Sequence, residues 1–107
     1  MPLIKKLNRE LHWTSHAKAK MRYYGLSQAR VKRVMHSPKR TEEGIAPGTI
    51  AMLQSAGSKK HPYEIWVMIV ETKAKRKVIS AWRYPGITKP GQPLPQQIIS
   101  EIEEIYE

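Results

Sequence analysis

His16, Lys20 and Arg83 are the residues of this 107-residue chain whose types suit chemistry at a phosphodiester. RNA is cleaved without metal when its 2′-hydroxyl attacks the neighbouring phosphorus, which requires a general base, a general acid and a cation at the phosphate. Histidine titrates near neutral pH and serves as base or acid, and arginine binds two phosphate oxygens at once. His16 is the candidate base or acid, although a purely structural role at the start of a helix remains open. Lys20 and Arg83 are candidate phosphate ligands, with Glu71 and Tyr84 as further candidates for the same site.

The charge of the chain favours a polyanionic partner. The chain has nineteen Lys and Arg residues and nine Glu residues, which gives a net charge of +10. Residues 1–90 hold all of the basic side chains, whereas residues 91–107 hold four Glu and no base. Such an excess attracts nucleic-acid phosphate. Three groups of residues are candidate nucleic-acid contacts. The first is the basic cluster Lys73, Lys75, Arg76 and Lys77, which we expect in a turn between two strands, and the second is Arg30 and Arg33, which we expect on a helix. The third is Trp66, whose ring would stack a base.

Several classes of site are excluded by residues that the chain lacks. It has no Cys, so disulfides, zinc-thiolate sites and cysteine nucleophiles are absent. His12 and His16 have a metal-binding spacing, but Thr14 and Ser15 between them are typical of a helix start, so we expect neither a metal site nor a cofactor. The longest apolar run, Ile65–Val70, is far shorter than a membrane span, and no signal peptide is evident. These features predict a soluble cytoplasmic protein that does not insert into membranes.

Two short helices are predicted in the N-terminal half. Thr14 or Ser15 caps a helix over residues 16–24, which ends at Gly25, and Ser27 caps a second helix over residues 28–36, which Pro38 stops. The connection is so short that the helices form a hairpin. Before them, the Leu residues at positions 3, 7 and 11 indicate a helix, while residues 10–14 also suit a short strand; the sequence leaves both open.

Three strands are predicted next, over residues 49–54, 63–71 and 78–84. The fold class is therefore α+β, with the helical hairpin packed on a three- or four-stranded antiparallel sheet. If residues 73–76 form the last hairpin loop, Trp66 faces Arg83 across the strands. The other sheet face then carries Glu71 with Tyr84 and Trp82. One face must receive the helices, and the other face would form a groove for the ligand.

The C-terminal residues form a separate segment. Residues 85–95 are rich in Pro and Gly, and Pro95 starts a predicted acidic, apolar helix. We expect residues 1–85 to form the α+β domain, and residues 86–107 to be a linker and a helix that packs on the same domain. This helix either completes the core or covers the phosphate-binding groove.

The segment SHAKAKMRYYGLSQARVKRVMHSPKR, residues 15–40, resembles a family of short uncharacterised bacterial and archaeal domains with the signature H-A-x-x-R-M-x-x-R-G-I-S. His16, Ala17, Met21, Gly25 and Ser27 fit this signature. The chain departs from it with Lys for Arg at position 20, Tyr for a basic residue at 24 and Leu for Ile at 26.

That family is similar to the RelE/ParE-like toxins, including BrnT. The resemblance covers about residues 12–85 and implies a RelE-like fold, a toxin–antitoxin context with an acidic antitoxin partner, and action on RNA, including ribosome-bound mRNA. Metal-independent endoribonuclease activity is thus the first functional hypothesis. A non-catalytic RNA- or DNA-binding module that uses the same basic face is the second. A small interaction domain whose charge only aids solubility is the third.

Overall fold

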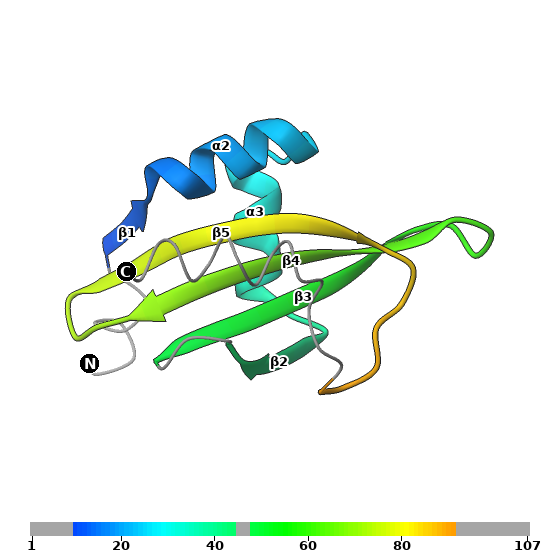
Figure 1. Ribbon diagram of the computed structural model, residues 1–107. Coiled ribbons are helices and arrows are strands. Elements are labelled where there is room, and N and C mark those ends of the chain that lie inside the picture. Colours follow the sequence, from blue (N-terminus) through cyan, green and yellow to red (C-terminus); the bar gives the residue numbers. More distant parts are fainter. Residues whose placement is uncertain (1–9, 45–47, 92–107) are drawn as a thin grey trace.

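The computed structural model describes residues 10–44 and 48–91. Two helices and five strands follow one another along this part of the chain, as Figure 1 shows: β1 (Glu10–Trp13), α2 (Ser15–Tyr24), α3 (Gln28–His36), β2 (Arg40–Glu43), β3 (Thr49–Gly57), β4 (Pro62–Glu71) and β5 (Lys75–Pro85). The predicted C-terminal helix and the N-terminal leucines at positions 3 and 7 lie outside the described residues.

The strands form one mixed sheet in the order β1-β5-β4-β3-β2. β1 runs parallel to β5, and the other neighbouring pairs are antiparallel. The prediction of a RelE-like, purely antiparallel sheet of three or four strands is therefore wrong. The error lies at both edges of the sheet, where β1 and β2 are each only four residues long and β2 has no apolar residue.

β1 settles the choice that the sequence left open for residues 10–14. Leu11 and Trp13 pack against the core on the helix side of the sheet, while Glu10 and His12 are exposed. This alternation is the strand period of two. β1 pairs with β5 in parallel, from Glu10↔Lys75 to Trp13↔Val78.

β2 has the sequence RTEE, which no hydrophobic pattern would identify as a strand. It pairs with β3 from Arg40↔Leu53 to Glu43↔Ile50. Charged residues are common on edge strands because they discourage pairing with further chains. The backbone hydrogen bonds to β3 therefore define β2, and burial contributes little.

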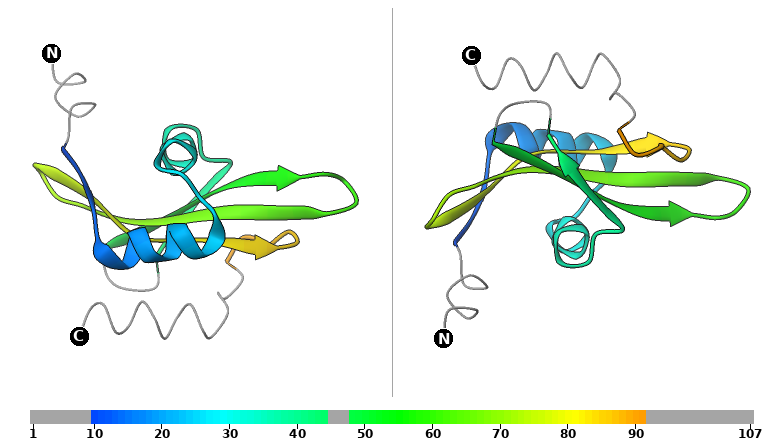
Figure 2. Two further views of the ribbon diagram at one scale, coloured as in Figure 1. Left: turned by 90° about the horizontal axis from the view of Figure 1, so that it is seen from above. Right: turned by 90° about the horizontal axis from the view of Figure 1, so that it is seen from below.

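Both predicted helices are confirmed, with the expected caps. The Thr14 side chain accepts a hydrogen bond from the Ala17 N–H, and Ser27 accepts one from the Arg30 N–H. Gly25 ends α2 with φ +67°, a conformation that other residues adopt at a cost. α2 runs beside β5, whereas α3 crosses β4 and β3 (Figure 2).

Thr14 also ties α2 to the sheet, because its hydroxyl lies 3.0 Å from the Val78 carbonyl and 3.2 Å from the Ile79 carbonyl. Replacing Thr14 by alanine removes the cap and this contact, and we expect the free energy of unfolding to fall by about 1–2 kcal/mol. Urea denaturation followed by circular dichroism measures the change. Thr14→Ser keeps the hydroxyl and is the matched control; equal losses in both variants would contradict the capping role.

Apolar side chains pack on both faces of the sheet. The helix side is one cluster in which Ala17, Met21 and Val31 meet β4 and β5 residues such as Val67. The opposite side is a second cluster built around Trp66 and Trp82, whose rings stack at 5.7 Å with an interplanar angle of 9°. The strand β4 is thus buried on both faces, as its unbroken apolar run predicted.

No helix among the described residues is both long enough and apolar enough to cross a lipid bilayer.

Candidate nucleic-acid interface

His16 and Arg83 lie at opposite ends of α2. His16 is half-buried in the first turn, next to the cap residue Thr14. Arg83 donates from Nε to the carbonyl of Tyr24, the last residue of the helix, at 2.8 Å. Eight residues of helix separate His16 from Tyr24, which corresponds to about 12 Å. The structure therefore does not bring the candidate base and the candidate phosphate ligand to one phosphorus atom.

Lys20 lies one helical turn after His16 and interacts with two aromatic rings. Its Nζ is 5.6 Å from the centroid of Tyr23 and 5.8 Å from that of Tyr24. Arg83 makes a similar contact, with its guanidinium 5.0 Å from the centroid of Tyr63. The C-terminal end of α2 thus gathers two cations and three tyrosines, a grouping that we call the tyrosine cluster: Lys20, Tyr23, Tyr24, Tyr63 and Arg83.

The predicted register of the last hairpin is wrong. The turn after Glu71 is tighter than expected, because the Thr72 N–H bonds the Lys75 carbonyl at 2.8 Å and Glu71 pairs with Arg76. A bulge at Ile79 then adds one residue to β5, so that Trp66 faces Trp82 and not Arg83.

The register separates the predicted partners on the sheet. Arg83 pairs with Ile65 on the helix side, whereas Trp66 points to the opposite side. Glu71 forms an ion pair with Arg76, and Tyr84 packs against the cluster that contains Trp82. Neither of the two predicted grooves, Trp66 with Arg83 or Glu71 with Tyr84, is formed.

Trp66 is a core residue. Only 2% of its surface is exposed, and its Nε1–H donates to Glu64 at 3.1 Å. The structure therefore contradicts its predicted role in stacking a nucleic-acid base, because the ring is covered by protein.

The β4–β5 turn presents three exposed lysines, at positions 73, 75 and 77. Arg76 is half-buried and held by Glu71. The parallel pairing of β1 places Glu10 beside Lys75 and His12 beside Lys77. This end of the sheet is cationic, but the carboxylates of Glu10 and Glu71 reduce its positive charge.

The second predicted patch lies on α3. Arg33 is exposed, whereas Arg30 is half-buried and donates from Nη1 to Gln54 at 2.6 Å. Gln54 in turn donates to the carbonyls of Arg33 and Ser37, at 3.0 and 2.8 Å. Arg30 therefore helps to attach α3 to β3, and Arg33 is the more available cation.

A polar network beside β2 was not predicted. Arg40 donates to the Thr88 hydroxyl (2.7 Å) and carbonyl (3.2 Å), and the Thr88 hydroxyl donates to Glu64 at 2.7 Å. Glu64 is 1% exposed. These residues are far apart in the sequence and show no local pattern, so only the fold reveals the network.

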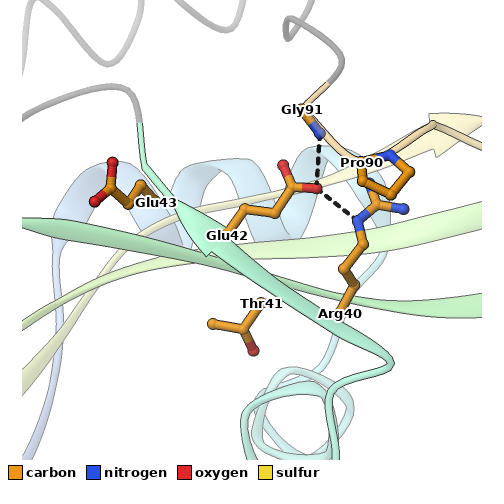
Figure 3. A pocket seen from close by; sticks show the side chains of 6 residues that line it. All are labelled: Arg40, Thr41, Glu42, Glu43, Pro90 and Gly91. Carbon is orange, nitrogen blue, oxygen red and sulfur yellow. Dashed lines mark hydrogen bonds and ion pairs between the residues drawn. The ribbon is translucent and has the colours of Figure 1, made fainter.

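Arg40 also lines a hollow of about 410 Å³ at the edge of the sheet, together with Thr41, Glu42, Glu43, Pro90 and Gly91 (Figure 3). Glu42 binds the Nε of Arg40 at 2.6 Å and accepts a hydrogen bond from the Gly91 N–H at 3.2 Å. Figure 3 shows these groups pointing toward one another, with Glu43 farther along β2. Arg40 and Glu42 form an ion pair, and their hydrogen bonds to Thr88 and Gly91 hold residues 88–91 against the edge of the sheet.

Most carboxylates among the described residues are engaged within the protein. The described residues contain sixteen Lys and Arg and five Glu. Three of these carboxylates are engaged within the protein: Glu42 with Arg40, Glu71 with Arg76, and Glu64 with Trp66 and Thr88. Glu10 and Glu43 are the two exposed ones.

The helices carry cations without any acid. The sequence has no Asp or Glu between Glu10 and Glu42, a stretch that includes α2 and α3. We use the name helical face for the exposed Lys and Arg side chains of these helices together with the exposed Tyr23: Lys18, Arg22, Tyr23, Lys32 and Arg33. The exposure of Tyr23 was not predicted from the sequence.

Within the described residues, no group of three or more His or Glu side chains lies close enough together to hold a metal ion. The sequence matches no protein-family model and no curated protein, and the fold matches no solved structure.

Proposed function

We propose that this protein is a non-catalytic nucleic-acid-binding module that contacts the phosphate backbone through its helical face. The observation that carries the proposal is the unopposed positive charge of α2 and α3, which have no carboxylate in their sequences. Phosphate contacts by Lys and Arg supply most of the affinity of sequence-independent binding. Lys18 and Arg22 are one helical turn apart and both exposed, so they can follow one strand of backbone.

Binding is proposed in place of cleavage because strand scission needs a base and a cation at the same phosphate. Lys20 lies one helical turn after His16, but Arg83, the candidate that would bind two phosphate oxygens, is at the other end of α2 and donates from Nε to the Tyr24 carbonyl. The helical face by itself supports attraction and positioning of a phosphate chain.

The salt dependence of binding tests this proposal. We expect the affinity for a fluorescent single-stranded RNA, measured by anisotropy, to fall steeply as salt rises. The double variant Lys18→Gln/Arg22→Gln should lower the slope of log K against log salt by about 1.4, because each lost phosphate contact on a single strand contributes about 0.7.

The matched control is Lys59→Gln/Lys60→Gln, which removes the same charge from exposed residues in the β3–β4 connection. A smaller change in this control supports the helical face, whereas equal changes would show that binding is spread over the whole surface. Absence of salt-dependent binding by the unaltered protein would refute the function. Cleavage of the RNA in chelator, lost in His16→Ala, would establish a nuclease instead.

A further inference from the structure

Tyr23 has an unusual position for an aromatic side chain. It is 77% exposed, and the other large apolar side chain that is strongly exposed among the described residues is Ile87, at 65%. Tyr23 lies on α2 directly after the exposed Arg22 and three residues after Lys20. An exposed aromatic face surrounded by cations is the combination that proteins use to hold single-stranded nucleic acid.

The ring of Tyr23 is positioned by its neighbours. It meets the ring of Tyr24 edge-to-face, with the centroids 4.8 Å apart and the planes at 82°. Tyr24 packs against both core clusters, so it is anchored in the fold. Lys20 contacts both rings. A side chain that is already ordered loses less entropy when a ligand binds.

Arg83 makes the surroundings of Tyr23 favourable for phosphate. The C-terminus of a helix carries a partial negative charge on its free carbonyls, which would repel an anion. Arg83 donates to one of these carbonyls, that of Tyr24, and brings a full positive charge to the end of α2. That bond uses only Nε, and the guanidinium also lies 5.0 Å from the centroid of the Tyr63 ring.

We propose that Tyr23 stacks an unpaired nucleobase, with the adjoining phosphates on Lys20 and Arg22, and that this contact makes the protein prefer single strands to duplexes. The inference rests on the proposed function and specifies its ligand. In a duplex, the faces of the bases are covered by their neighbours, and only an unpaired base offers its π face to a side chain.

Anisotropy with a fluorescent RNA of 12 nucleotides and with the duplex of the same sequence provides the test. In Tyr23→Ala, we expect single-strand affinity to fall about 5- to 140-fold, the range that follows from loss of one stacked base. Affinity for the duplex should change by less than about twofold, since phosphate contacts remain. Tyr23→Phe keeps the ring and should restore most of the single-strand affinity.

Ile87→Ala is the matched control, because it removes exposed apolar surface outside α2. A fluorescent base analogue, 2-aminopurine, in the single strand gives an independent signal: stacking on Tyr23 changes its emission, and the change disappears in Tyr23→Ala. If Tyr23→Ala loses equal affinity for single strand and duplex, or loses affinity for neither, the stacking site is overturned. The proposed function still stands in that case if binding by the protein depends on salt. If the unaltered protein binds neither RNA, both proposals fail.

Discussion

Trp66→Ala is expected to lower the free energy of unfolding by about 3–5 kcal/mol, the cost of removing a buried aromatic side chain. Trp66 is 2% exposed, stacks on Trp82 and donates to Glu64. The variant therefore leaves a cavity on the side of the sheet opposite the helices and removes a donor from a buried carboxylate. Domains of this size are stable by about 5–15 kcal/mol, so the loss is a large fraction of the total.

Guanidinium denaturation followed by far-ultraviolet circular dichroism measures this loss without depending on tryptophan fluorescence. Trp66→Phe is the matched control, since it keeps an aromatic ring in the cluster and loses only the indole N–H and part of the volume. We expect it to be clearly less destabilised than Trp66→Ala. A Trp66→Ala protein with unchanged stability and weakened RNA binding would restore the base-contact role that the sequence suggested.

Glu64→Ala is expected to destabilise the fold by about 2–4 kcal/mol, because its removal leaves buried donors without an acceptor. The Trp66 indole and the Thr88 hydroxyl both donate to Oε1 of Glu64, and Arg40 donates to the same Thr88 hydroxyl. Loss of this carboxylate therefore also weakens the attachment of Thr88 beside the sheet.

The conservative variant Glu64→Gln separates these effects, since its amide oxygen accepts the same two hydrogen bonds without the charge. We expect less than about half of the loss found for Glu64→Ala, measured by the same denaturation. Equal losses in the two variants would mean that the negative charge opposite Arg40, and not the pair of accepted hydrogen bonds, is what stabilises the network.

The helices were predictable from the sequence because their signals are local. Thr14 and Ser27 as caps, Gly25 as the left-handed terminator and the apolar spacing of each helix all act within one or two turns. The central strand β4 was predictable for a similar reason, since ten residues with an apolar middle leave few alternatives.

The edges of the sheet and its register were not predictable, because they depend on pairing between distant residues. β2 is defined by backbone bonds to β3, and the bulge at Ile79 shifts β5 by one residue against β4. A shift of one residue moves side chains to the opposite face. The bulge therefore places Trp66 and Arg83 on opposite faces of the sheet, so the predicted groove between them is not formed.

The sequence by itself determined the charge of this protein and the place of its helices, since both follow from residue types and local spacing. Which cations remain available depends on the tertiary structure, which pairs Arg40 and Arg76 with carboxylates and leaves Lys18 and Arg22 exposed beside the exposed ring of Tyr23. Ion pairing and burial depend on which distant segments are neighbours in the sheet, and the strand register determines which residues become neighbours.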